Sequence, residues 1–157
     1  MTSRFYAVSQ RQIQRQRGVS LLEVLIAVLV LSVGLLGVAG LQTANIRNTQ
    51  SAHQRTMAVL LASSMGERIR ANAVAALNGS YTLSLQCNAL SPGGTLQSIE
   101  HANWIAEIQT AFGGAGTSCG AVSYNQGTRT YTVTVQWDDS RALGGRASMT
   151  ITHVARI

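Results

Sequence analysis

Residues 18–41 read GVSLLEVLIAVLVLSVGLLGVAGL, and they are the most informative segment of the chain for its fold. From Val24 to Leu41 it runs for 18 residues without a charged side chain. Because an α-helix rises about 1.5 Å per residue, that run would extend roughly 27 Å, close to the hydrocarbon thickness of a bilayer. The stretch therefore predicts a membrane-spanning helix, with bounds at residues 19–42.

The charges around this stretch predict its orientation. The chain has 157 residues and a net charge of +6, from 12 Arg and six acidic residues. Positive charge favours the cytoplasmic side of a membrane helix, so we expect residues 1–18 in the cytoplasm and residues 43–157 in the periplasm of a Gram-negative bacterium. Without residues 1–18, eight Arg and six acids leave only +2, which removes most of the support for a nucleic-acid partner. The four arginines of the leading segment are Arg4, Arg11, Arg15 and Arg17.

A glycine directly before the apolar stretch predicts an unusual processing site. Conventional signal peptidase cuts after the hydrophobic region, at small residues. A cut after Gly18 would instead remove the arginine-rich segment and keep the membrane helix. We therefore predict a leader peptide at residues 1–18. The alternative is a conventional cut at Ala39-Gly40, which would release a secreted binding domain that begins near Leu41.

Glu23 is an acid near the start of the apolar stretch. A carboxylate inside a membrane helix costs about 2.5–3.5 kcal/mol on insertion scales, so it normally has a partner. A cut after Gly18 would create one, because Val19 would then carry a positively charged α-amine. In a polymer, Glu23 could pair with the amine of the next subunit. The alternative is a carboxylate at the membrane interface that is protonated or reaches toward water.

The helical pattern continues past the apolar stretch as far as Leu77. Apolar residues recur there at spacings of three and four, which predicts a second half with one face to bury. No proline interrupts the segment, and Asn78-Gly79 supplies a stop signal. We therefore predict one continuous helix from Val19 to Leu77. The residues of its buried face are expected to be Met57, Leu60, Leu61, Met65, Ile69, Ala73 and Leu77.

The remaining chain predicts a small α+β head. Residues 80–96 have the composition of a loop, and Ile99–Phe112 has helical periodicity. The middle of three expected strands alternates apolar and polar residues, which predicts an antiparallel sheet with one buried face. The fold class is therefore α+β, with a long N-terminal helix packed against a small antiparallel sheet. The expected strands are Ala121–Tyr124, Thr130–Trp137 and Ala147–Val154.

Two cysteines, Cys87 and Cys119, both lie in the part predicted to be exported. The periplasm is oxidising, and an even number of cysteines there favours pairing. We therefore predict a disulfide between them, which would stabilise the head by about 3–4 kcal/mol. The alternative is two unrelated thiols.

No pattern in the chain predicts catalysis or a cofactor. His53, His101 and His153 lack the spacing of metal ligands. Asp138-Asp139 has too few acids nearby for calcium and fits a turn before a strand. No serine lies in a nucleophile elbow, and Gly113–Gly116 lacks the ending of a phosphate loop. We therefore expect no catalytic residue, metal site or cofactor. An enzyme displayed on a membrane anchor would need a convergent polar site in the head, and the sequence predicts none.

The junction Gly18-Val19-Ser20-Leu21-Leu22-Glu23-Val24-Leu25 resembles the class III signal of type IV prepilins and type II secretion pseudopilins. The resemblance implies the type IV pilin fold. It also implies that an inner-membrane prepilin peptidase cuts between Gly18 and Val19 and methylates the new N-terminus. Glu23 matches the family's acid that is associated with subunit registration. Val19 departs from the family's usual first mature residue, phenylalanine.

Later stretches are similar to minor pilins of the PilV, or type IV pilus modification, group. They are residues 35–42, 65–72, 75–81 and 131–139. This resemblance implies a minor pilin that primes or joins type IV pilus assembly and supports twitching motility and adhesion. Its expected partners are the major pilin, other minor pilins, the inner membrane and a tip adhesin, and it would end in the pilus at the cell surface. The alternative is a minor pseudopilin of a type II secretion system.

Overall fold

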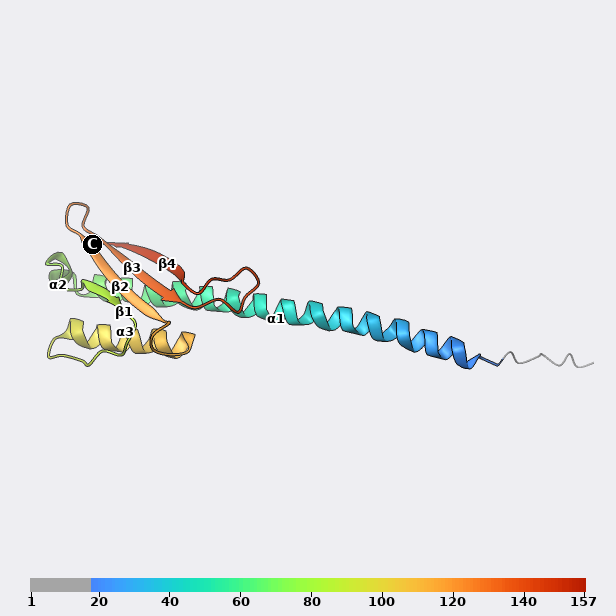
Figure 1. The fold of residues 1–157 in the computed structure, drawn as a ribbon. Coiled ribbons are helices and arrows are strands. Elements are labelled where there is room, and N and C mark those ends of the chain that lie inside the picture. The colour runs from blue at the N-terminus through green and yellow to red at the C-terminus, as the bar shows by residue number, and fades with distance from the viewer. Residues whose placement is uncertain (1–17) are drawn as a thin grey trace, which may run out of the picture. The chain divides into compact units, whose positions relative to one another are not determined.

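The computed structural model describes residues 18–157. The predicted leader, apart from Gly18, and its four arginines therefore lie outside the described residues. The described chain is α+β, with three helices and a four-stranded antiparallel sheet (Figure 1). It falls into two compact units that divide between Gly40 and Leu41.

Helix α1, Leu21–Ala71, begins in the first unit and continues into the second. Over its N-terminal part it is long and apolar enough to cross a membrane, judged by length and composition. All side chains from Leu21 to Leu41 are exposed in the structure, so their burial depends on something outside the chain. Ser32, the one hydroxyl in this part, donates to the Val28 carbonyl (2.7 Å) and so presents no unpaired polar group to a hydrocarbon surrounding.

The predicted continuous helix to Leu77 is wrong at Asn72. Helix α1 ends at Ala71, and a separate short helix α2 covers Ala73–Leu77. Asn72 lies between them with φ −119° and ψ 60°, outside the helical region. In the folded head, hydroxyls from the sheet bond carbonyls of α2, and the local sequence pattern carries no signal for these contacts. Tyr131 donates to Ala76 (2.7 Å) and Tyr124 to Leu77 (3.4 Å).

The sheet contains β1 (Leu83–Gln86), β2 (Cys119–Asn125), β3 (Thr130–Trp137) and β4 (Met149–Arg156), in that spatial order. The predicted alternation in β3 is confirmed. Its buried residues are Tyr131, Val133, Val135 and Trp137. The other strands differ from expectation: β1 lies inside the segment expected to be a loop, β2 begins two residues earlier and ends one residue later, and β4 begins and ends two residues later. A four-residue strand is too short to show a clear period, and β1 is stabilised by pairing with β2.

One face of the sheet packs on the part of α1 that follows Leu41, partly through the predicted stripe, of which Met65 and Ile69 are fully buried. The buried α1 residues include Ala58, Ala62, Met65, Gly66 and Ile69. Of the predicted face, Leu60, Ala73 and Leu77 are exposed. Small residues form this contact because β4 lies very close to the helix. A Cβ added at Gly66 would be 3.0 Å from Cδ2 of His153.

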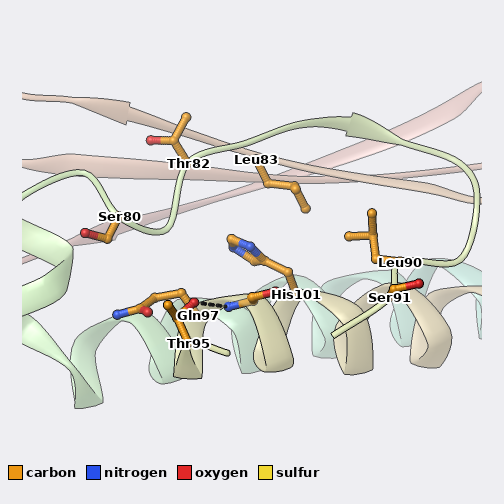
Figure 2. Close-up of a pocket in the computed structure, with 9 residues that line it drawn as sticks. Ser80, Thr82, Leu83, Leu90, Ser91, Thr95, Gln97 and His101 are labelled. Atoms are coloured by element: carbon orange, nitrogen blue, oxygen red, sulfur yellow. Dashed lines mark hydrogen bonds between the residues drawn. The ribbon is translucent and has the colours of Figure 1, made fainter. Parts of the chain in front are cut away.

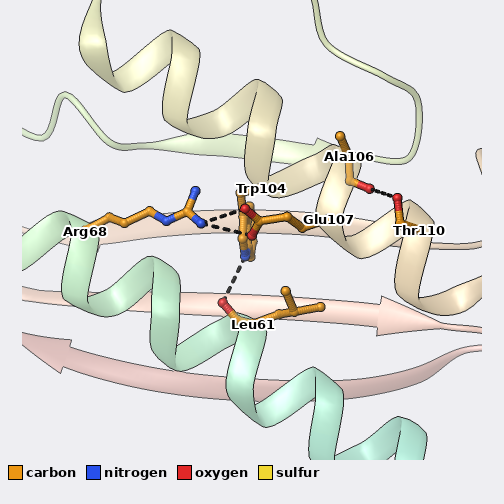
Figure 3. A network of polar contacts seen from close by, with 6 residues as sticks. All are labelled: Leu61, Arg68, Trp104, Ala106, Glu107 and Thr110. Carbon is orange, nitrogen blue, oxygen red and sulfur yellow. Dashed lines mark hydrogen bonds and ion pairs between the residues drawn. The ribbon is translucent and has the colours of Figure 1, made fainter.

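Helix α3, Leu96–Phe112, covers the remainder of the same face, beside α1 (Figure 1). It starts three residues before the predicted helix, where the Thr95 hydroxyl caps it by accepting from the Ser98 N–H (3.3 Å). Its Trp104 lies between the layers and donates to the Leu61 carbonyl of α1 (2.9 Å). On the outer side of this contact, Arg68 of α1 binds both carboxylate oxygens of Glu107 (Figure 3).

A disulfide joins Cys87, just after β1, to Cys119 at the start of β2. The 32-residue separation between the two cysteines contains all of α3. The Cys87 carbonyl also accepts hydrogen bonds from Gly116 N–H (2.7 Å) and from the Gln109 amide (3.3 Å). The covalent bond and these contacts hold both ends of the α3 segment at one edge of the sheet.

Candidate processing and assembly site

The predicted junction lies just before α1, in chain that is exposed and not helical. Gly18, Val19 and Ser20 belong to no helix or strand, and the Val19 side chain is 70% exposed. Among the described residues, no atom beyond the chain neighbours lies within 4 Å of the position that a Cβ on Gly18 would occupy. In that part of the chain, nothing therefore packs over Gly18.

Ser20 caps the start of α1. Its hydroxyl accepts from the Leu22 N–H (3.3 Å), and its carbonyl accepts from the N–H groups of Glu23 (3.0 Å) and Val24 (3.2 Å). With Glu23 three residues later, the order Ser-x-x-Glu is that of a capping box. The capping role of Ser20 was not predicted, although the Ser-x-x-Glu spacing is a readable signal for it. The cap fixes the helix start two residues after Val19, so cleavage at the junction would not shorten α1.

Glu23 lies in the first turn of α1. Its neighbours around a shallow surface depression are apolar, including Val19, Ala27 and Val28. Among residues 18–157, no cationic side chain forms an ion pair with it. A carboxylate in a first turn is favoured by the partial positive charge of the helix N-terminus, by about 0.3–1 kcal/mol at an exposed position. That is well below the cost of burying the same charge in lipid.

Cleavage would change the charge at this end of α1. The new ammonium group on Val19 would lie four residues from Glu23, and it would face the positive end of the helix dipole. Its best available partner in the chain is therefore the Glu23 carboxylate. N-methylation of the amine keeps its charge. The arrangement thus produces one positive and one negative group at the tip of an apolar helix.

A second polar contact joins the head to α1, through Asp139. This carboxylate is only 3% exposed, accepts from the Ser51 hydroxyl (2.7 Å) and lies 3.9 Å from the Arg55 guanidinium. Asp138-Asp139 lies in a turn, as predicted, but the burial of Asp139 against α1 was not predicted. Sequence gave no signal for it, because Ser51 and Asp139 are 88 residues apart.

A third set of polar contacts surrounds Tyr81, which is fully buried. Its hydroxyl donates to Glu100 (2.6 Å), and burial, reinforced by this carboxylate, raises the pKa of Tyr81 to about 12. His101 donates from Nε2 to the Tyr81 carbonyl (3.2 Å), and burial lowers the pKa of His101. Figure 2 shows His101 between α3 and β1, at a cavity of about 480 Å³.

The three histidines do not come together, since His53 lies on α1, His101 on α3 and His153 on β4. In the part of the chain that the structure describes, no three metal-ligating side chains are grouped closely enough to hold an ion.

Comparison with known proteins gives one match, in the region of the junction. A family model described as "Prokaryotic N-terminal methylation motif" matches residues 13–39, which include Gly18, Val19, Glu23 and most of the apolar run. The chain carries a type IV pilin-like prepilin signal. No curated protein and no solved structure matches the chain.

The prepilin signal and the fold agree with each other. A long N-terminal helix followed by a small antiparallel sheet is consistent with the type IV pilin fold. Together they indicate a structural protein that is anchored in a membrane and associated with a pilus-like assembly. The signal implies processing by a prepilin peptidase and assembly with other pilins. It is equally compatible with a pilin and a pseudopilin.

Proposed function

We propose that this chain is a minor pilin of the PilV-like group. A prepilin peptidase removes residues 1–18 and methylates Val19, and the mature subunit primes or joins type IV pilus assembly. Before assembly it is a single-pass inner-membrane protein with residues 43–157 in the periplasm. Its partners are the major pilin, other minor pilins and a tip adhesin. The observation that carries the proposal is Glu23, an unpaired acid in the first turn of an apolar helix, directly after an exposed glycine junction.

The energetics of Glu23 favour a polymer over a monomer. Alone in a bilayer, the carboxylate costs about 2.5–3.5 kcal/mol. Within one subunit, the Val19 ammonium can reduce that cost only where both groups stay near the interface. In a filament, the apolar helices pack against one another, so an ammonium from one subunit and Glu23 from the next are desolvated together. Such a pair is favourable only if both charges are present. It therefore favours the one alignment of neighbouring subunits in which the ammonium of one meets Glu23 of the next.

The proposed role predicts a specific defect for Glu23→Ala. The variant should insert into the membrane and be cleaved normally, because the apolar run and the junction are unchanged. Its recovery in sheared surface filaments should fall roughly tenfold or more, since the neighbouring ammonium would be buried without a partner. Immunoblots of membrane and filament fractions measure both quantities. Wild-type recovery of the variant in filaments would remove the assembly role of Glu23.

A matched control is Glu67→Ala, which removes an equal charge from the exposed surface of α1 in the head. Glu67 pairs with Arg70 one turn later and is exposed, so its loss should cost only a few tenths of a kcal/mol. Filament recovery of this variant should match that of the wild type.

A minor pseudopilin of a type II secretion system is the second candidate, since the methylation motif serves both assemblies. Deletion of the gene separates the two. Loss of piliation and twitching, with normal exoprotein secretion, supports the pilin, and loss of secretion with normal piliation supports the pseudopilin.

A further inference from the structure

The sheet of the head has two edges, and they differ. One edge is β1, which is four residues long and whose register with β2 is irregular between Leu83 and Gln86. The other edge is β4, which pairs with β3 in unbroken register over all eight of its residues. In Figure 1, β4 is the outermost strand on its side of the sheet. Short or irregular strands hinder pairing with another chain, so the edge at β1 is protected and the edge at β4 is not.

The direction of the main-chain groups of β4 follows from its pairing with β3. The Ile157 N–H donates to the Arg129 carbonyl (3.1 Å), which continues the β3–β4 register by one residue. In an antiparallel ladder every second residue bonds the neighbouring strand, and the residues between direct N–H and C=O to the other side. The Arg156 carbonyl agrees with this pattern, since it accepts from Nε of Arg70 on α1 (3.4 Å). The residues that direct their main-chain groups outward are therefore Thr150, Thr152, Val154 and Arg156.

The side chains along this edge favour a partner strand that alternates apolar and polar residues. On the face toward α1, Met149 and Ile151 are half-buried and pack against the core. On the opposite face, Val154 is 59% exposed and lies across from Thr132 of β3. From residue 149 to residue 155 the strand contains no arginine, no acid and no proline, which are the residues that would repel an added strand. An added strand would extend the apolar face and the polar face together.

Arginines lie at both ends of the edge. Arg156 ends β4, Arg129 lies across from it directly before β3, and Arg146 lies three residues before β4 begins. All three are exposed, and among residues 18–157 none has a carboxylate within ion-pair distance. The acids of this end of the head are Glu67, which is paired within α1, and the terminal carboxylate of Ile157. The edge therefore favours a partner that carries negative charge.

The same charges disfavour a second copy of this chain. Antiparallel pairing of two β4 strands would bring Arg156 of one copy toward Arg146 of the other, and parallel pairing would bring the two Arg156 side chains together. Like charges on neighbouring strands are destabilising.

We propose that the outer edge of β4 binds an extended segment of a different polypeptide, which adds a strand to the sheet. The segment alternates apolar and polar residues over roughly 24 Å, the length of β4 at about 3.4 Å per residue, and has an acidic residue at the end beside Arg129 and Arg156. Main-chain hydrogen bonds to Thr150, Thr152 and Val154 supply affinity, and the side chains supply selectivity. The inference concerns the head alone and does not depend on processing at Gly18.

The test uses the full-length protein in detergent, with fluorescent peptides as probes. Each peptide has the eight-residue length of β4, alternates valine and threonine, and carries aspartates at its N-terminal or its C-terminal end. One of the two should bind roughly tenfold more tightly than its counterpart with arginines in place of the aspartates, as measured by fluorescence anisotropy. Which of the two binds gives the direction of the added strand. A proline at the centre of that peptide should abolish binding, because it removes a main-chain donor.

Variants of β4 separate edge pairing from other binding. Thr152→Pro removes an outward N–H and leaves the bonds to β3 in place, so it should weaken peptide binding roughly tenfold or more. Thr152→Ala keeps the N–H and should bind as the wild type does. Arg156→Glu should remove the preference for the acidic peptide, which keeps the test decisive if Thr152→Pro fails to fold. Its matched control is Arg47→Glu, which should keep the preference, since Arg47 lies 19 residues along α1 from Gly66, where β4 contacts the helix.

Three results would overturn the inference: equal binding of acidic and basic peptides, no binding of either, or full binding by folded Thr152→Pro. A dimer in analytical ultracentrifugation that Thr152→Pro abolishes would assign the edge to a second copy and would also contradict it. Leader cleavage, measured on protein from the same strains, keeps the two proposals apart. Normal cleavage without peptide selectivity overturns only the β4 edge, and peptide selectivity with an uncleaved leader overturns only the pilin role.

Discussion

At the residue scale, β2 and α3 approach each other closely at Gly120. A Cβ at this position would lie 2.6 Å from Cζ3 of Trp104 and 2.9 Å from Cδ1 of Ile105. Trp104 cannot move away freely, because its indole N–H is bonded to the Leu61 carbonyl. The glycine is therefore a packing requirement rather than a turn signal, and the sequence pattern alone could not distinguish the two.

We predict that Gly120→Ala lowers the free energy of unfolding by about 1–3 kcal/mol, through overpacking. Urea denaturation of the detergent-solubilised protein, followed by tryptophan fluorescence, measures it. Gly127→Ala is a matched control, since its Cβ would lie 3.5 Å from the Asn125 side chain, at an ordinary contact distance. A cost for Gly120→Ala no larger than that of the control would contradict the packing account.

Tyr81 gives a prediction for alkaline pH. Its pKa is raised to about 12 in the folded protein by burial and by Glu100, against about 10 in an unfolded chain. Because folding disfavours the charged form, the stabilisation is fully present below pH 10 and is lost as the pH rises from about 10 through 12. The free energy of unfolding should therefore fall steeply over this interval.

Tyr81→Phe should flatten that fall, and it should also remove the tyrosinate absorbance that develops near pH 12. The pKa of Tyr131 is raised too, again mainly by burial, so some pH dependence should remain in the variant. An unchanged titration in Tyr81→Phe would show that another group controls the alkaline transition.

At the scale of elements, α3 depends on the disulfide that encloses it. Opening the disulfide between Cys87 and Cys119, which are 32 residues apart in sequence, frees the segment between them. By loop-closure entropy, the double variant Cys87→Ser, Cys119→Ser should lose about 3–4 kcal/mol of stability. Hydrogen exchange should increase first in α3, because the sheet keeps its β2–β3 and β3–β4 pairing.

The wild-type protein under reducing conditions is the control for this experiment, and it should reproduce the behaviour of the double variant. If α3 keeps its protection while the sheet loses it, then the bond supports the sheet and not the helix.

The elements that sequence predicted well are those whose pattern is long or regular. The apolar run marks the start of α1. The alternation of apolar and polar residues predicts both ends of β3, because the polarity of each side chain indicates which face of the sheet it occupies. The strand β1 and the packing of α1 around Gly66 depend on partners far away in sequence. Local periodicity carries no information about a tyrosine hydroxyl from the sheet or about how closely β4 approaches Gly66.

At the scale of the whole molecule, the candidate site was predictable because it is local. Gly18, Val19 and Glu23 lie within six consecutive residues, and their meaning depends on order rather than on folding. The polar contacts of the head, such as Asp139 with Ser51, required the fold to bring distant segments together. These contacts of the head therefore could not be predicted from sequence order alone.

The most direct test is the intact mass of the mature protein purified from membranes of the native host. The account predicts a chain that begins at Val19, contains residues 19–157, and carries one additional methyl group on its N-terminal amine. In a strain that lacks prepilin peptidase, the same chain should keep residues 1–18. A native protein that retains its arginine-rich leader, or one that begins near Leu41, would contradict the account.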